Sequence, residues 1–128
     1  MSLSPTQRTM GALRSQGNRC EVVERFNPHV GDHGVRHDLF NIIDILVLDP
    51  AQGITGVQAC AGSGFKKHIR KLTEEHAQES IDWLTCGGKL MVYGWRKVKL
   101  KRGGKAMRWK PRIQEITLKD FETGGEKQ

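Results

Sequence analysis

The chain has 128 residues, of which 37% are hydrophobic, and this size suits one domain with one modest core. Its 21 Lys and Arg residues outnumber its 14 Asp and Glu residues, and the net charge of +7 favours a polyanionic partner. The longest apolar run, residues 42–48, is short and interrupted by Asp44, which excludes a transmembrane helix and predicts that the protein does not associate with a membrane.

The first half of the chain predicts one helix followed by three strands. Ser followed by Pro is typical of a helix start and Gly of a helix end, while apolar, β-branched runs separated by Gly, Pro and Asp indicate strands joined by turns. The predicted elements are a helix from Ser4 to Gly17, a strand over residues 20–26, a loop over 27–35, and a hairpin of two strands over 39–48 and 54–60, with a turn at 49–53.

The second half predicts two helical segments and two further strands. Ser63 is expected to cap a helix whose apolar stripe is Phe65, Ile69 and Leu72. The remaining elements are a helical segment over residues 75–85, a strand over 89–95, a basic connection over 96–106, a strand within 107–118, a closing turn over 117–121 and a disordered tail over 122–128. The order α-β-β-β-α-(α)-β-β predicts a single α/β domain over residues 1–121, with a mixed β-sheet flanked by helices.

Two polar side chains interrupt the apolar strands of the predicted hairpin. Asp44 in the first strand and Gln58 in the second are placed to hold a magnesium ion through oxygen atoms. Asp38 lies six residues before Asp44, hence on the same side of a regular strand, and is a further candidate ligand. The structural alternatives are an ion pair of Asp44 with Arg36 or a lysine, and a satisfied core amide at Gln58.

The element order and this motif resemble the PD-(D/E)XK nuclease superfamily, most closely its Mrr-like and Holliday-junction-resolvase-like branches and small phage-encoded members. The resemblance covers about residues 5–95. In that superfamily the second strand supplies an Asp, which Asp44 matches, and the third supplies an acid or Gln followed two residues later by Lys. Gln58 matches the Gly-Val-Gln variant of Mrr-type enzymes, but Cys60 stands where the lysine is expected. The resemblance implies a restriction-endonuclease-like fold with a degenerate motif.

The resemblance also implies Mg²⁺ or Mn²⁺ as the cofactor, which polarises the scissile phosphate while a lysine offsets negative charge. Cys60 cannot offset phosphate charge and is expected to be a small buried hydrophobe, so Lys66 or Lys67 of the following helix is expected to replace the lysine. Many family members carry a Glu in the first helix, which this chain lacks there. The oxygen donors that could take its place are Gln7, Glu21, Glu24 and Asp38.

The basic excess is concentrated toward the C-terminus. Ten Lys or Arg residues and no acidic residue lie between Lys89 and Arg112, which favours a surface that binds nucleic-acid phosphates. Trp95 and Trp109 flank its middle part, residues 96–108, with core packing as their expected role and base stacking as the alternative. The residues predicted to contact DNA, double-stranded or branched, are Arg70, Lys71, Arg96, Lys97, Lys99, Lys101, Arg102, Lys105, Arg108 and Lys110.

The sequence thus predicts a DNA endonuclease that hydrolyses phosphodiester bonds in a metal-dependent reaction, with Asp44, Gln58, Lys66 and Lys67 as catalytic residues. Because of Cys60, the alternative is a catalytically inactive nuclease-fold protein that binds DNA or takes part in phage assembly. The absence of a signal-peptide pattern and the widely spaced cysteines favour the cytoplasm of a bacterial or phage-infected host. By analogy with resolvase-like relatives, a homodimer is one expected assembly.

Overall fold

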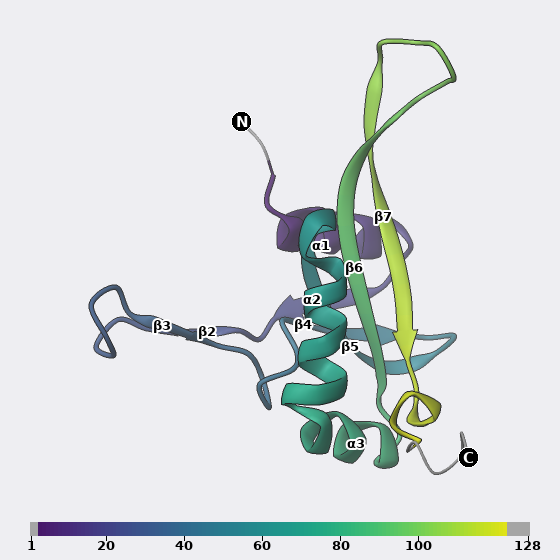
Figure 1. Cartoon of the computed structure of the whole chain (residues 1–128). Coiled ribbons are helices and arrows are strands. Elements are labelled where there is room, and N and C mark those ends of the chain that lie inside the picture. Colours follow the sequence, from purple (N-terminus) through teal and green to yellow (C-terminus); the bar gives the residue numbers. More distant parts are fainter. Residues whose placement is uncertain (1–2, 123–128) are drawn as a thin grey trace.

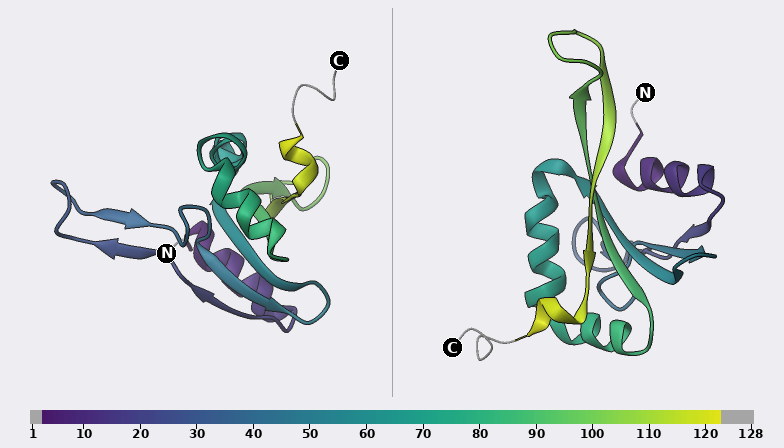
Figure 2. Two further views of the ribbon diagram at one scale, coloured as in Figure 1. Left: turned by 90° about the horizontal axis from the view of Figure 1, so that it is seen from below. Right: turned by 90° about the vertical axis from the view of Figure 1, so that its right-hand side faces the viewer.

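The computed structural model describes residues 3–122 as an α/β fold with three layers. Its helices and strands are α1 (Pro5–Ser15), β1 (Arg19–Val22), β2 (Arg25–Asn27), β3 (Val35–His37), β4 (Ile45–Asp49), β5 (Gly53–Ala61), α2 (Phe65–Arg70), α3 (Ala77–Thr85), β6 (Lys89–Lys99) and β7 (Met107–Ile116). Short helical turns precede and follow α2, namely η1 (Gly62–Gly64) and the π-helical η2 (Lys71–Glu75), and η3 (Leu118–Phe121) follows β7. A mixed five-stranded sheet lies between α1 on one face and α2 on the other (Figures 1 and 2). The predicted α/β fold with a mixed sheet flanked by helices is confirmed.

The strands of the main sheet follow the order β1-β4-β5-β6-β7, and neighbouring strands are antiparallel except β5 and β6. α2 and α3 form the long crossover that this parallel pair requires. β4 and β5 form the predicted hairpin, in which Ile45 lies opposite Val57. This register sets Asp44, just before β4, beside Gln58 in the centre of the sheet.

Apolar side chains pack on both faces of the sheet. On the α2 side, Phe65 and Leu72 of the predicted apolar stripe are buried. On the α1 side, Leu13 and Trp95 belong to a second cluster, and the Trp95 indole N–H donates to Thr9 Oγ1 at 2.8 Å. The predicted core role of Trp95 is confirmed. Each fully buried side chain of this size contributes about 1.5–3 kcal/mol, so the packing of α1 and α2 fixes the position of both helices.

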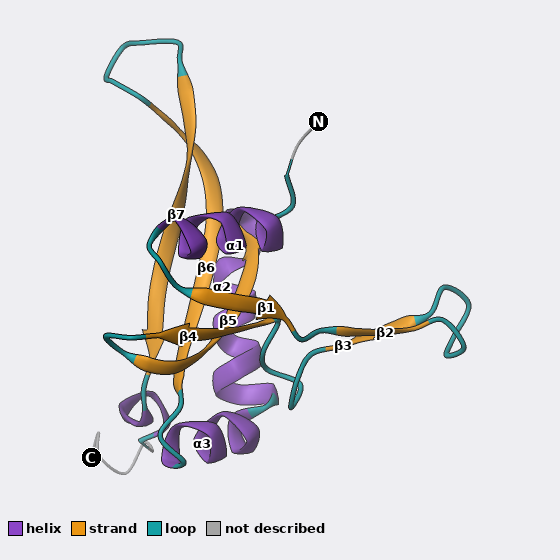
Figure 3. Ribbon diagram, turned by 180° about the vertical axis from the view of Figure 1, so that it is seen from behind, coloured by secondary structure: helices purple, strands orange, loops and turns teal. Residues whose placement is uncertain are grey.

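The β2–β3 hairpin projects from the body as a separate two-stranded arm (Figures 1 and 3). The prediction of one strand over residues 20–26 is wrong, because the chain leaves the main sheet after β1 and β2 pairs with β3, with Phe26 opposite Arg36. The predicted loop therefore closes a hairpin of its own.

The outer part of β6 and β7 forms a second projecting arm, which rises above the body in Figure 1. The ladder continues to the pair Lys99 and Met107, so the predicted connection over residues 96–106 is shortened to the stretch between these two residues. Antiparallel pairing satisfies the backbone groups of this basic segment without burying its charged side chains.

Both ends of α1 follow the local sequence signals, whereas the start of α2 does not. Ser4 caps α1 as predicted, with its Oγ accepting from the Gln7 N–H at 3.1 Å and Gln7 Oε1 accepting from the Ser4 N–H at 2.9 Å. Gly17 follows the helix with a φ of 90°, also as predicted. Ser63 does not cap α2, because it lies inside η1, and Gly64 takes the capping position.

The segment before β4 is a tight turn, where the sequence predicted a regular strand from residue 39. The Leu39 and Ile43 backbones exchange hydrogen bonds of 2.9 and 3.0 Å, and Phe40 and Asn41 adopt φ values of 54° and 65°. The predicted closing turn is confirmed as η3. Of the predicted tail over residues 122–128, residues 123–128 lie outside the described part of the chain.

Close packing of α2 on β6 gives a stability prediction. A Cβ at Gly94 would stand 2.6 Å from the Phe65 ring, which is itself buried in the core. We expect Gly94→Ala to lower the free energy of unfolding by about 1–3 kcal/mol, measured by urea denaturation.

Gly11→Ala is the matched control, because a Cβ there meets nothing within 4 Å and Gly11 lies inside α1. That change is expected to leave the free energy of unfolding unchanged or to raise it by about 0.5–1 kcal/mol. Equal losses in the two variants would contradict the packing described for Phe65.

Candidate metal centre

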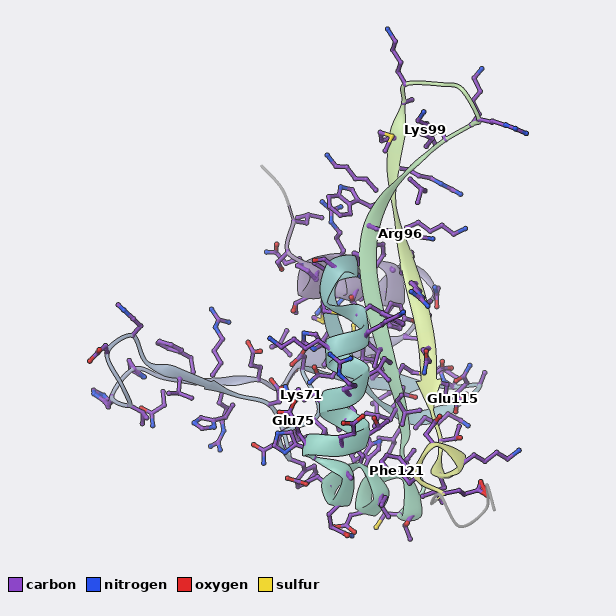
Figure 4. All side chains as sticks on the ribbon, in the orientation of Figure 1. Lys71, Glu75, Arg96, Lys99, Glu115 and Phe121 are labelled. Atoms are coloured by element: carbon purple, nitrogen blue, oxygen red, sulfur yellow. The ribbon has the colours of Figure 1, made fainter. Side chains whose placement is uncertain are left out.

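A polar pocket of about 460 Å³ opens where the β2–β3 arm joins the body. It is lined by side chains from α1, β3, β5, α2, η2 and the segments next to β1 and β4, including Glu24, Arg36, Asp38, Asn41, Asp44, Gln58, His68 and Lys71. Figure 4 shows Lys71 near the base of this arm. The structure therefore brings together the three predicted ligands Asp38, Asp44 and Gln58.

Three carboxylates form the acidic part of the pocket. Glu24, Asp38 and Asp44 each offer an oxygen atom, and these oxygens lie within 4.8 Å of one another. Asp44 is buried and the other two are half-buried. Clustered carboxylate oxygens are the hard ligands that Mg²⁺ and Mn²⁺ prefer, so the donor set fits the cofactor that the sequence predicted.

Each carboxylate is positioned in the pocket by a different local structure. Asp44 is fixed by the hairpin, where its Oδ2 accepts from the Ala59 N–H at 3.0 Å. Asp38 is brought back by the tight turn over residues 39–43, so the expectation that it shares the side of a regular strand with Asp44 is wrong although the two residues meet. Glu24 lies in the short connection between β1 and β2.

Gln58 is fully buried and lies between the two aspartates. Its Nε2 donates to Asp38 Oδ2 at 2.6 Å and to Asp44 Oδ1 at 3.4 Å, and its Oε1 accepts from His68 Nδ1 at 2.8 Å. The amide therefore turns its donor side toward the carboxylates. It could ligate a metal only after the amide group turns over, which would exchange the atoms facing His68 and the aspartates.

The lysine of the pocket is Lys71. Its Nζ donates to Asp38 Oδ2 at 2.8 Å, and the side chains of Lys71 and Asp38 are 28% and 10% exposed. Lys71, one of the residues predicted to contact DNA, forms the ion pair of this pocket. It is the first residue of the π-helical turn η2, a wide turn of a kind that often occurs at functional sites.

A lysine that follows the motif strand does line the pocket, but it is Lys71 of η2 and not Lys66 or Lys67 of α2. Lys66 and Lys67 are exposed and, within the described residues, neither lines the pocket. The buried stripe of Phe65 and Leu72 fixes the rotation of α2, and Lys67 lies one turn before Lys71 on that helix. Lys71, one turn further along the helix, therefore lines the pocket in place of the two predicted lysines.

Cys60 is buried in the α2-side core, as predicted for a small hydrophobe. Burial, together with the negative charge of Asp44, raises the pKa of the Cys60 thiol to about 11. The thiol stays neutral near pH 7 and provides no positive charge to the pocket.

The two aspartates have opposite pKa shifts. Burial, followed by the hydrogen bond and negative charge of Asp38, raises the pKa of Asp44 to about 8. Burial also acts to raise the pKa of Asp38, but hydrogen bonds with Asp44, Lys71 and Gln58 and the charge of Lys71 outweigh it and lower this pKa to about 2. In the metal-free protein near pH 7 the pair therefore retains one proton, on Asp44, and the protonated carboxyl group donates to Asp38.

His68 was not predicted, although its position three residues before Lys71 places both on neighbouring parts of one helix. Burial, followed by the charge of Lys71, lowers the pKa of His68, which keeps the imidazole neutral. Among the alternatives for a further acid, Glu24 lies in the pocket, while Gln7 is used in the helix cap and Glu21 lines a different hollow. Arg36 pairs with Glu24 at 2.9 Å, not with Asp44.

The residues predicted to bind DNA lie mostly on the β6–β7 arm. Figure 4 shows Arg96 and Lys99 along this arm, apart from Lys71. The predicted basic residues that are exposed are Arg70, Arg96, Lys97, Lys99, Lys101, Arg102, Lys105, Arg108 and Lys110. Only Lys71 of the predicted set belongs to the pocket.

Trp109 departs from its expected core role. It is 38% exposed, and Arg8 Cζ and Lys97 Nζ lie 3.9 and 5.5 Å from its ring centroid. Trp109 lies on β7, an edge strand of the sheet, where its ring stays at the surface. The side chains of Arg8 and Lys97 make cation–π contacts with that ring.

Comparison of the chain with protein-family models, with curated proteins and with solved structures finds no match. Within residues 3–122, none of the helices has the length and apolar character needed to cross a membrane.

The raised pKa of Asp44 predicts that the metal-free protein loses stability as the pH rises. The contribution of the protonated carboxyl is fully present below its ordinary pKa of 3.8 and is lost as the pH rises through about 8. Asp38 acts in a separate window, because its contribution is present above 3.8 and lost as the pH falls toward 2. Urea denaturation in EDTA at about pH 6 and about pH 9 is expected to give a lower free energy of unfolding at the higher pH.

Asp44→Asn is the control, since an amide does not titrate and can still accept from the Ala59 N–H. Its loss of stability between the two pH values is expected to be much smaller. Mg²⁺ or Mn²⁺ added at about pH 9 is expected to stabilise the parent protein and not this variant. The same pH dependence in both proteins would contradict the assignment of the proton to Asp44.

Proposed function

We propose that this protein is a metal-dependent DNA endonuclease of the PD-(D/E)XK type in which the lysine has moved to the helix after the motif strand. The observation that carries the proposal is one pocket that holds three carboxylates and the Lys71 ammonium group. The element order supports it, because a helix, three strands of the main sheet, crossover helices and two further strands are what the sequence resemblance implies.

The residues of the pocket suit hydrolysis of a phosphodiester bond. Glu24, Asp38 and Asp44 would hold a divalent ion, which when bound polarises the scissile phosphate and lowers the pKa of a water molecule. Lys71 would offset negative charge on the phosphate, the role that the neutral thiol of the motif cannot take. Gln58 would keep the aspartates together, and its amide oxygen is a further candidate ligand.

The distribution of charge suits double-stranded or branched DNA as the substrate. The acidic pocket attracts a metal ion but repels phosphate by itself, whereas the exposed basic residues of the β6–β7 arm can neutralise several phosphates. Binding through the arm would keep the chain of phosphates close to the protein while one of them approaches the metal centre.

A catalytically inactive DNA-binding protein is the second candidate function. The observation that favours it is the satisfied state of the metal-free pocket, where the Gln58 amide and the Lys71 ammonium already donate to the aspartates. A metal ion would have to displace these donors. Such a protein would bind DNA in a salt-sensitive way without cleaving it.

Cleavage of supercoiled plasmid and of four-way junction DNA in Mg²⁺ or Mn²⁺ tests the proposal. We expect cleavage that Asp44→Asn lowers by about a hundredfold or more, because loss of a metal ligand removes several kcal/mol of transition-state stabilisation. Calorimetric titration with Mn²⁺ should show the matching loss of metal binding. Cleavage unchanged in Asp44→Asn would contradict the proposal, and DNA binding with no metal-dependent cleavage by the parent protein would establish the second candidate.

Two lysine variants serve as a matched pair in the same assay. Lys71→Met is expected to lower the cleavage rate by about 10²–10³-fold, while Lys67→Met, one helical turn away, keeps nearly the full rate. Comparable losses in both variants would show that the charge of the helix as a whole, not the Lys71 ammonium, supports cleavage.

The role of the β6–β7 arm predicts the salt dependence of DNA binding. Lys101→Gln combined with Arg102→Gln removes two exposed charges from the end of the arm. We expect the slope of log affinity against log salt concentration to fall by about 2, since each phosphate contact contributes about 0.9. Fluorescence anisotropy with a labelled duplex measures the slope.

Arg19→Gln combined with Lys119→Gln removes the same charge from exposed positions away from the arm. This control is expected to keep the parent slope. If both double variants change the slope equally, net charge and not the arm determines DNA binding.

A further inference from the structure

A second hollow, the aromatic hollow, adjoins the metal centre. Its volume is about 540 Å³, and its lining includes Arg25, Phe26, His37, Phe40 and Asn41. His37 and Asn41 also line the acidic pocket, so the two hollows meet at these residues. A ligand that reaches from one hollow to the other would place one part against the carboxylates and another against the aromatic rings.

The two aromatic rings of this hollow are held on one side and open to solvent. Phe26 is 55% exposed and Phe40 is 58% exposed. The Phe26 ring lies close against Gly34, where a Cβ would stand 2.5 Å from it, and Phe40 lies beside Trp83 with ring centroids 6.4 Å apart. Rings placed in this way can stack on a ligand without first giving up much side-chain freedom.

The backbone at the floor of the hollow is strained. Phe40 and Asn41 have φ values of 54° and 65°, which residues other than glycine rarely adopt and which cost about 1–3 kcal/mol each. The same turn brings Asp38 to Asp44 and leaves the Phe40 ring at the surface. One strained turn therefore serves the metal centre and the aromatic hollow together.

We propose that the aromatic hollow binds the base of an unpaired nucleotide next to the phosphate held at the metal centre. This inference rests on the proposed nuclease function and names its substrate class, DNA with an unpaired nucleotide at a branch, bulge or gap. Aromatic rings stack on any base, and Arg25 and His37 suit the neighbouring phosphates. The Asn41 Nδ2 donates to Glu79 at 3.3 Å, which leaves the Asn41 carbonyl oxygen to accept from a base edge. A base inside an intact duplex has no free face to offer to Phe26 and Phe40.

Fluorescence of 2-aminopurine tests this inference without cleavage. The base is placed as a single unpaired nucleotide in a duplex, and binding is measured by quenching and by anisotropy in Ca²⁺, which carboxylate oxygens also bind, over a time in which the DNA stays intact. We expect Phe26→Ala combined with Phe40→Ala to weaken binding of this DNA about tenfold or more and to abolish quenching, because stacking contributes roughly 1–3 kcal/mol per base. Affinity for the fully paired duplex should stay the same.

Two further variants make the result specific. Leu48→Ala combined with Ile54→Ala removes a similar exposed apolar area at the β4–β5 turn and is expected to leave both affinities unchanged. Phe26→Tyr combined with Phe40→Tyr keeps the rings and is expected to restore quenching. If the alanine variant binds the unpaired and paired DNA as the parent does, the inference is overturned.

The outcomes also separate this inference from the proposed function. Metal-dependent cleavage that does not depend on the two rings would overturn the base-binding hollow and leave the nuclease proposal standing. Quenching that depends on the rings in a protein that never cleaves would support the hollow and count against nuclease activity.

Discussion

Gln58 connects the centre of the sheet to the turn before β4 by donating to Asp38 and Asp44, and to α2 by accepting a hydrogen bond from His68. Two carboxylates so close together cannot both be ionised at low cost, since one is buried and each disfavours the charge of the other. The Gln58 amide, the Lys71 ammonium and one retained proton offset that cost. The pocket is therefore a set of mutually dependent groups, in which removal of any member leaves a buried acceptor or charge without its partner.

The same helix contributes to the core and to the pocket. α2 has six residues and would not be stable alone, but Phe65 at its start and Leu72 just after its end are buried against the sheet. Their packing fixes the rotation of the helix and thereby turns His68 toward Gln58 and Lys71 toward Asp38. A change in the core beneath α2 would move these polar groups, so the stability of the fold and the geometry of the pocket are linked.

Opposite charges occupy different parts of this protein. Three carboxylates meet in one pocket, while a run of exposed basic side chains over residues 96–110 lies along the β6–β7 arm. Two hairpins leave the body, one basic and one that carries an aromatic ring at the rim of the pocket, and this arrangement suits a polyanion that must be held in several places. The tight turn at Phe40 joins the pocket and the aromatic hollow, because its unusual backbone places Asp38 inside and an aromatic ring outside.

Local signals were sufficient for features that depend on neighbouring residues alone. The Ser4 cap, the hairpin that sets Asp44 beside Gln58 and the burial of Cys60 could be predicted, since capping, turn chemistry and strand alternation act over a few residues. Tertiary structure decided the rest of the pocket. Glu24 and Lys71 enter it from segments far apart in the sequence, and their meeting depends on where the chain leaves the main sheet and on how the buried face of α2 sets its rotation. Sequence periodicity defines which side chains share a face of one element, but only packing between elements determines which charges face one another.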